Sequence, residues 1–495
     1  MPRLSGTDTM MLAAETPAWH FHVGGLTIVE SDGDPRATLQ RIAAEVEQRL
    51  ALAPKFTWKL RTVPFGLDRP VWVRDEDFDI SRHVHFVTLP SPAGRREVAA
   101  LAGRIMSRQL DRRYPLWEMY LIDGLANNRV AMLMKCHHCM MDGVSGAGLA
   151  TILDDIERHP AHPPRPTGHE PQLSENPSRL SLLISAIPRV TMTPMRLGRG
   201  GLALARRAAT ILTFSDDEGQ VYRYTGAPRT SFNGPIGPRR AFGFSSVALA
   251  DVLVLKKHFN VKVNDVVLAV CAGALRNYLI GNGERIETPL VTGVPVSTRG
   301  TDMTMDNQIG TICVPLATDI ADPVQRLLHI HENAQAAKAM HHEIRAHEMP
   351  SMGELASPAV LEFLMRTLSQ THLISRLTTP MNTIISNVPG PPFDLFMAGG
   401  RITGIFPTSV IVETMGLNIT LFSYGDRMDF GVYVDPQAVP DPFLVAEGIP
   451  AALRELLAAA GLGEPTPVLD PFGEPTAPRA RRDARRVRHT ATLAT

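Results

Sequence analysis

Residues 129–143 read Arg-Val-Ala-Met-Leu-Met-Lys-Cys-His-His-Cys-Met-Met-Asp-Gly, and the rest of the chain is organised around them. The apolar run Val130–Cys136 follows a turn signal at Asn127-Asn128, which predicts a buried strand. Residues 143–156 have apolar side chains at helical spacing, Ile156 among them, and predict a helix. The adjacent histidines therefore lie where a strand passes into a helix, a position that presents side chains to a cleft.

Strand alternation separates His137 from His138. Successive side chains point to opposite faces of a strand. His138 would therefore share its face with the apolar residues of the run, which are Val130, Met132, Met134 and Cys136. Lys135 and His137 would point the other way. If the strand stays regular that far, His138 has the desolvated position. An imidazole there can take a proton from a hydroxyl, which makes His138 the predicted catalytic residue.

Three other interpretations fit the same residues. A metal site would use the flanking cysteines with the histidines, but adjacent residues on an extended chain point apart, and zinc ligands are usually spaced more widely. Asp142 can be the N-cap of the following helix, alongside any other role. The histidines can also be core residues, as single histidines often are. Two of them followed by Asp142-Gly143 favour a functional site instead.

Composition limits the classes of function. The 495 residues suffice for two or three domains, and a net charge of zero gives no electrostatic reason to expect nucleic-acid binding. Four cysteines are too few for a disulfide framework and predict a cytoplasmic protein. The N-terminus lacks an apolar signal core, and no stretch approaches the roughly 20 uncharged apolar residues of a spanning helix. Any membrane contact is therefore expected to be peripheral.

Short motifs stand on both sides of the histidines. Pro115-Leu116-Trp117 ends a predicted helix and supplies bulk for packing, so residue type favours a structural role. Asn264-Asp265 opens an apolar helix, where either residue can be the N-cap. The remaining motifs are Pro295-Val296-Ser297-Thr298-Arg299, Asn307-Gln308-Ile309-Gly310 and Asn387-Val388-Pro389-Gly390-Pro391.

Three further stretches have a distinctive composition. Residues 179–214 combine apolar bulk with arginines and contain no acid, which fits either a basic amphipathic segment on an anionic membrane or a packed crossover helix. Strand patterns at 402–412, 417–424 and 428–434 predict an antiparallel meander. Beyond Gly463 the chain is rich in Pro and Arg, which predicts disorder.

Together, the motifs from residue 1 to about 460 resemble those of the bacterial wax ester synthase/diacylglycerol acyltransferases, in the chloramphenicol-acetyltransferase-like superfamily. His-His-x-x-x-Asp-Gly at 137–143 is similar to the active-site motif of that superfamily, which peptide-synthetase condensation domains share. Pro115-Leu116-Trp117 resembles a motif that condensation domains lack in this form. Asp306 precedes Asn307 where the family usually has Gly, so the local turn is expected to differ.

The resemblance implies an α/β fold of two chloramphenicol-acetyltransferase-like domains with an active-site tunnel at their interface. We expect an N-terminal domain with the histidine motif at 1–160 and a linker or crossover with the basic segment at 161–240. A C-terminal domain is expected at 241–462, followed by a disordered basic tail at 463–495.

The implied reaction moves a long-chain acyl group from acyl-CoA to a lipid hydroxyl. Diacylglycerol would give triacylglycerol, and a long-chain alcohol would give a wax ester. His138 is the implied general base, and neither metal nor cofactor is expected, because acyl-CoA is a substrate. The implied catalytic motif is His137, His138, Asp142 and Gly143. Binding or structural support is expected from Asn264, Asp265, Pro115, Leu116, Trp117, Arg299 and Asn307.

Within that set, Asn264 is the candidate to stabilise the oxyanion, and Arg299, then Arg61, the candidate partner of Asp142. Two other classes remain open: a condensation-type or polyketide-associated acyltransferase that uses a carrier-protein thioester, and a non-catalytic lipid-surface protein. Because both acceptors are insoluble in water, the protein is expected in the cytoplasm, bound peripherally to a membrane or lipid droplet.

Overall fold

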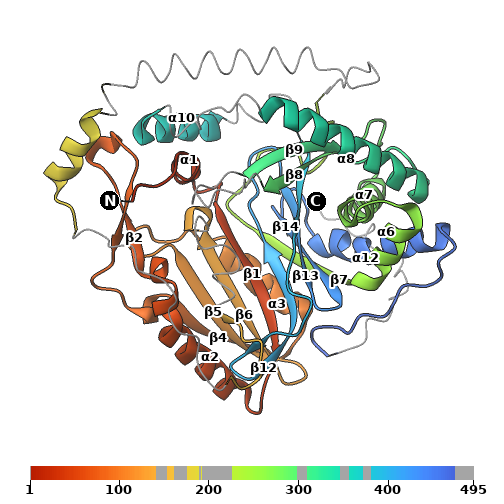
Figure 1. Cartoon of the computed structure of the whole chain (residues 1–495), viewed down its shortest axis with the longest axis horizontal. Coiled ribbons are helices and arrows are strands. Elements are labelled where there is room, and N and C mark those ends of the chain that lie inside the picture. The colour runs from red at the N-terminus through yellow and green to blue at the C-terminus, as the bar shows by residue number, and fades with distance from the viewer. Residues whose placement is uncertain are drawn as a thin grey trace, which may run out of the picture.

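The computed structural model describes residues 2–140, 153–160, 176–188, 191, 226–297, 309–345, 356–371, 379 and 381–473. Within this part of the chain, two six-stranded sheets lie side by side with helices packed on them (Figure 1). A small hairpin sheet pairs β2 (Trp58–Arg61) with β3 (Val71–Arg74). The mixed α/β architecture with two sheet-rich units confirms the predicted fold class.

The first sheet carries the histidines and has the strand order β11-β12-β1-β6-β5-β4. Only β4 and β5 pair in parallel; the other neighbours are antiparallel. Helices α2 (Pro35–Arg49) and α3 (Arg95–Met106) cover opposite faces, because each packs in a separate hydrophobic cluster with alternate residues of β6. The strands are β1 (His22–Glu30), β4 (Val84–Ala93), β5 (Trp117–Leu125), β6 (Arg129–His137), β11 (Phe396–Met397) and β12 (Gly400–Thr408).

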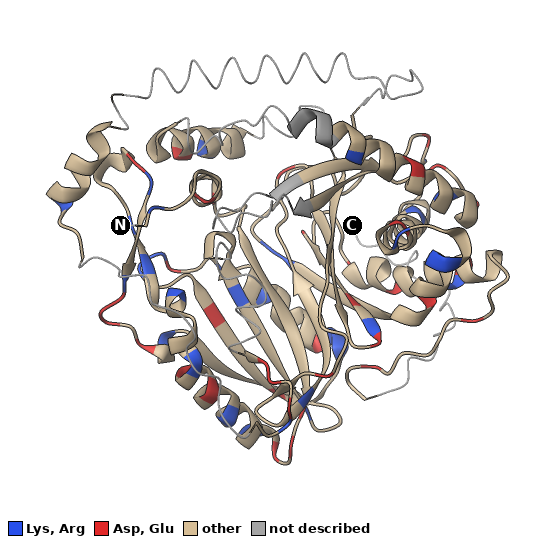
Figure 2. Cartoon of the chain, viewed as in Figure 1, with Lys and Arg blue, Asp and Glu red and all other residues tan. Residues whose placement is uncertain are grey.

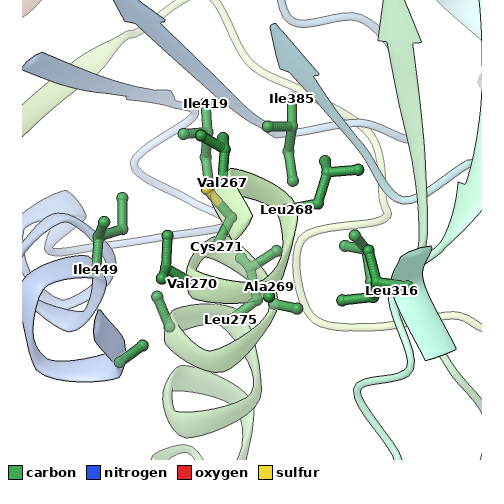
Figure 3. Packing of buried hydrophobic residues seen from close by; sticks show 14 of the residues in the cluster. Val267, Leu268, Ala269, Val270, Cys271, Leu275, Leu316, Ile385, Ile419 and Ile449 are labelled. Carbon is green, nitrogen blue, oxygen red and sulfur yellow. The ribbon is translucent and has the colours of Figure 1, made fainter. Parts of the chain in front are cut away.

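The second sheet has the order β7-β14-β13-β10-β8-β9 and a single large core. Its strands are β7 (Ala241–Ala248), β8 (Val291–Ser297), β9 (Ile309–Pro315), β10 (Thr383–Val388), β13 (Leu417–Tyr424) and β14 (Arg427–Val434). Its helices are α6 (Leu249–Phe259), α7 (Val263–Gly281), α8 (Pro323–Arg345) and α12 (Pro442–Ala459). Figure 3 shows Val267 and Cys271 of α7 directed toward Ile419 of the sheet, with Ile449 of α12 beside them.

Helix α7 is the most membrane-like helix of the described residues. Its 19 residues are long and apolar enough to cross a membrane by length and composition, although they include the charged residues Asp265 and Arg276. In the structure 72% of its most apolar 18 residues are buried inside the protein. Its apolar character therefore reflects its place at the centre of the second core.

Local sequence signals place α2 as predicted. The Asp34 carboxylate accepts a hydrogen bond from the Ala37 amide at 2.8 Å, and Pro35 occupies the first helical position. Leu39, Ile42 and Val46 are buried along one side. Charged residues of both signs lie along this helix and the outer loops, whereas the strands are mostly uncharged (Figure 2). The remaining α-helices with labels are α1 (Gly6–Ala14) and α10 (Pro358–Thr371).

The predicted antiparallel meander is wrong in its first strand. Strands β13 and β14 do pair with each other, but β12 pairs with β1 in the other sheet, with Phe406 opposite Leu26. The hairpin β11–β12 of the second half therefore completes the sheet of the first half. The division of the chain at residues 160 and 241, and a tunnel between the halves, stay predictions.

The predicted disordered tail begins too early. Phe472 is buried and stacks on Phe244 with ring centroids 6.1 Å apart. The Asn127 side-chain amide donates to the Phe472 carbonyl at 2.6 Å, and Arg95 lies 3.5 Å from the Asp470 carboxylate. Residues 464–473 are therefore packed on the folded protein, and residues 474–495 lie outside the described residues.

The helix predicted at 143–156 lies largely outside the described residues, but its end is visible. Asp155 pairs through its backbone with Phe396 of β11, so the helix has ended before this point. Ile156 is 70% exposed, which contradicts its predicted place on the buried side.

Candidate active site

The two histidines lie at one end of the first sheet. Strand β6 ends at His137, and His138 begins the short 3-10 turn η5 (His138–Met140). The His137 amide donates to the Leu116 carbonyl at 2.9 Å, and the His138 amide donates to the Phe21 carbonyl at 2.7 Å. The backbones of the neighbouring segments therefore hold both residues in place independently of their side chains.

Strand alternation holds up to His137 and fails at the next residue. Cys136 lies in the hydrophobic cluster that includes α2, whereas His137 lies on the opposite face. Because the regular strand ends there, His138 does not continue the apolar face. His137 is 1% exposed and His138 is only partly buried. The desolvated position predicted for His138 therefore belongs to His137.

His137 is neutral and holds the turn that carries His138. Burial lowers the pKa of His137 to about 3, so its ring has one proton at neutral pH. Its Nδ1 accepts a hydrogen bond from the Cys139 amide at 3.2 Å, which places that proton on Nε2. His137 thus acts as a structural clamp across two residues, and His138 is the more exposed residue of the pair.

Pro115-Leu116-Trp117 supports this end of the sheet. All three residues are buried, and the Leu116 carbonyl is the acceptor for the His137 amide. The Trp117 indole donates to the Phe56 carbonyl at 2.7 Å and stacks on His83 at 4.6 Å between ring centroids. These contacts agree with the structural role that residue type favours for the motif.

A buried polar cluster, which sequence reasoning did not identify, adjoins His137. The Glu15 Oε2 atom lies 3.9 Å from His137 Nε2 and accepts from Arg112 at 2.7 Å. Its Oε1 atom lies 3.3 Å from His22 Nε2, and His20 stacks on His22 at 5.3 Å. We call Glu15, His20, His22, Arg112 and His137 the histidine cluster.

The histidine cluster contains one charged pair, Glu15 and Arg112, and three neutral imidazole rings. Burial lowers the pKa of His20 to about 4, and it also lowers the pKa of His22. Burial alone raises the pKa of Glu15, but the His22 ring and the charge of Arg112 are among the influences that outweigh it and hold the pKa at about 2. Glu15 is therefore an anion balanced by Arg112 at neutral pH. The signal in the sequence is weak: His22 stands opposite His137 in the β1–β6 register, a pairing visible only after folding.

Asp265 has a structural role at the start of α7. The predicted N-cap, Asn264 or Asp265, is wrong, because Lys262 occupies that position. The Asp265 carboxylate accepts from the Lys262 amide at 2.9 Å and from Nδ1 of His331 in α8 at 2.5 Å. Helix α7 packs against α6, α8, α12 and the second sheet. The role of Asn264 at an oxyanion stays a prediction.

Several predicted site residues lie outside the described residues: Asp142, Gly143, Arg299 and Asn307. Arg61, the second candidate partner of Asp142, donates to the Asn176 side chain at 2.8 Å. The pairing of Asp142 therefore stays a prediction. Within the described ranges, no three His, Cys, Asp or Glu side chains gather as a metal-binding group.

Comparison with known proteins extends over nearly the whole chain. Residues 4–267 match the wax ester synthase/diacylglycerol acyltransferase catalytic domain, and residues 305–457 match the C-terminal domain of the same family. A putative diacylglycerol O-acyltransferase of Mycobacterium tuberculosis is 34% identical over 92% of this chain and 90% of its own. A probable diacylglycerol O-acyltransferase of the same organism is 32% identical over 93% of this chain and all of its own.

Solved structures give the same result. The wax ester synthase/diacylglycerol acyltransferase from Marinobacter aquaeolei VT8 is 28% identical, with a TM-score of 0.68 over 93% of this chain and all of that one. The first condensation domain of the CDA synthetase is 15% identical, with a TM-score of 0.54 over 93% and 97% of the two chains. The latter similarity concerns the fold alone.

Proposed function

The chain belongs to the wax ester synthase/diacylglycerol acyltransferase family and is an acyl-CoA-dependent O-acyltransferase, and from that premise we propose that diacylglycerol is its acceptor and His138 its general base. The partly buried, backbone-anchored His138, beside the clamped ring of His137, carries the mechanistic part of this proposal. The names of the mycobacterial relatives support the choice of acceptor.

The proposed reaction is a direct transfer. His138 removes the proton from the acceptor hydroxyl as the oxygen attacks the thioester carbonyl of acyl-CoA, so that a carbon–oxygen bond forms. The tetrahedral oxyanion then collapses, the carbon–sulfur bond breaks, and the imidazolium returns the proton to the departing CoA thiolate. Atoms and protons balance without a covalent enzyme intermediate. A structural His137 cannot take this role, since its Nδ1 is engaged by the Cys139 amide.

The acceptor assay is the first test. We expect the full chain, given one long-chain acyl-CoA with diacylglycerol and a long-chain alcohol at equal concentration, to make mainly triacylglycerol and to release free CoA in equal amount. Thin-layer chromatography measures the product and a thiol reagent measures CoA. Wax ester as the main product would overturn the proposed acceptor. Turnover only with an acyl-carrier-protein thioester would instead support a condensation-type enzyme.

We also propose that the protein binds a lipid surface peripherally through exposed apolar side chains on one side of the molecule. The helix Arg179–Pro188 buries Leu182 and Ala186 against the β2–β3 hairpin and leaves its other face exposed. Nearby, Gly66 of the turn η3 (Pro64–Gly66) lies directly against Ala359 of α10. The exposed residues, here called the apolar face, are Phe65, Leu180, Ile184, Ile187, Val360 and Phe363.

Exposed apolar patches of this kind often mark sites of membrane or protein interaction. The segment predicted to be basic and amphipathic, 179–214, thus begins with a helix that packs on one side and is exposed on the other. Its arginines at 189, 196, 199, 206 and 207 lie outside the described residues. A cytoplasmic location with lipid-droplet or membrane association remains part of this proposal.

Replacing Phe65, Ile184 and Phe363 with Ser is expected to lower sedimentation with anionic liposomes several-fold, because these side chains are 58–81% exposed and would enter the interface. Turnover of a short-chain, water-dispersed acceptor should stay within about twofold. The matched control replaces Leu444 and Leu469, which are 57% and 72% exposed outside the apolar face, and should bind like the parent. Equal sedimentation of the triple variant and the parent would refute the proposed surface.

A further inference from the structure

We infer that Glu15 is a positioning residue for the proposed base, because it fixes the proton of His137 on Nε2 and so keeps Nδ1 free to hold the turn that presents His138. This inference rests on the proposed role of His138. Glu15 ends helix α1, and its side chain is 3% exposed. Glu15 is thus a third residue of the candidate site, distant in sequence from His137 and His138.

Glu15 acts on the imidazole rings of His22 and His137 through its negative charge. An ionised carboxylate accepts hydrogen bonds but donates none, so a neutral imidazole nitrogen that faces it is favoured in its protonated form. His22 Nε2 lies 3.3 Å from one carboxylate oxygen, and His137 Nε2 lies 3.9 Å from the other. The second separation is too long for a hydrogen bond, so the effect on His137 is a charge–dipole attraction, strengthened by burial.

Arg112 keeps the carboxylate in place. Its Nε and Nη2 atoms donate to the same Glu15 oxygen at 3.1 and 2.7 Å, and Nη2 also donates to the Leu12 carbonyl. The Arg112 side chain is 45% exposed, so it joins the buried anion to the surface. The guanidinium therefore holds Glu15 ionised and oriented while its other oxygen faces His22.

The tautomer of His137 affects His138 through the Cys139 amide, which lies in the same turn as His138. If His137 carried its proton on Nδ1, the Cys139 amide would lose its acceptor, because two N–H groups would face each other. The turn His138–Met140 would then lose this hydrogen bond and keep the one from the His138 amide to the Phe21 carbonyl. A displacement of about 1 Å at a catalytic group costs on the order of a hundredfold in rate.

Glu15→Gln is the test, because it keeps the shape and removes the charge. Its carbonyl oxygen would stay on Arg112, so His137 Nε2 would face a neutral oxygen and would be favoured less strongly as the protonated nitrogen. We expect kcat to fall about tenfold to a hundredfold with the KM for acyl-CoA within about twofold. The 15N signals of histidine-labelled protein, with His137→Asn for assignment, should show His137 protonated on Nε2 in the parent and a larger share protonated on Nδ1 in the variant.

Glu118→Gln is the matched control. Glu118 is a partly buried acid on β5 that lies 3.3 Å from Lys135 Nζ and accepts from Tyr120, without touching His137. This variant should keep parental kcat and the parental His137 signal. A parent with His137 protonated on Nδ1, or a folded Glu15→Gln protein with parental kcat and tautomer, would overturn the inference. Those outcomes differ from an active His138→Ala protein, which would overturn the proposed base itself.

Discussion

His138→Ala is expected to lower kcat for acyl transfer by roughly 10²–10⁴-fold, the usual contribution of a positioned general base. The side chain is only partly buried, and its backbone is held by the Phe21 carbonyl, so the fold should survive. We expect the free energy of unfolding to change by less than about 1 kcal/mol. Steady-state kinetics with acyl-CoA and diacylglycerol, together with chemical denaturation, measure both effects.

His137→Ala is the companion variant, because it is expected to lose mainly stability, whereas His138→Ala is expected to lose mainly activity. Removing a wholly buried ring leaves the Cys139 amide without its acceptor, which costs about 1–3 kcal/mol of stability. Per folded molecule, this variant should retain more turnover than His138→Ala. If His138→Ala kept more than a tenth of the parental kcat while His137→Ala kept none, the assignment of the base would be wrong.

Trp117→Ala is expected to cause the largest loss of stability, about 3–5 kcal/mol, because it removes the largest fully buried side chain of the first sheet. The cavity would open beside His83 and Phe56, and the Phe56 carbonyl would lose its indole donor. Such a loss is a large share of the roughly 5–15 kcal/mol that keeps a typical protein folded. Urea unfolding followed by tryptophan fluorescence and circular dichroism measures it.

Trp117→Phe divides that loss into its two causes. The phenyl ring keeps most of the packing against His83 but cannot donate to the Phe56 carbonyl, so a loss of about 1–3 kcal/mol is expected. Equal destabilisation by Ala and Phe would show that the hydrogen bond, and not the ring volume, dominates. A negligible effect of both would contradict the supporting role of Pro115-Leu116-Trp117.

The features predicted correctly from the sequence are those encoded locally. Asp34-Pro35 marks the start of α2, and the apolar run before the histidines marks β6, because capping and alternation involve residues close in the chain. The order of the short motifs, read as a resemblance, also identified the family. These signals act over a few residues or repeat across relatives.

The features that were missed depend on long-range contacts. Strand β6 ends at His137 because its pairing with β5 and β1 ends there. Strand alternation, continued by one residue beyond this end, wrongly placed His138 on the apolar face. Phe472 lies in a stretch whose composition resembles a disordered tail. It is nevertheless buried, because it stacks on Phe244, which is far away in sequence. Glu15 has no motif around it, and only folding places it beside His137.

Because β12 is the outer neighbour of β1, the order of synthesis constrains how this protein folds. When the first 240 residues have left the ribosome, β1 can pair with β6, but its other edge has no partner until residues 400–408 have been made. An unpaired strand edge can template pairing with other chains. From the end of β6 at His137 to the start of β12 at Gly400, roughly 260 residues of elongation, the nascent chain therefore presents an aggregation-prone edge that chaperones can protect.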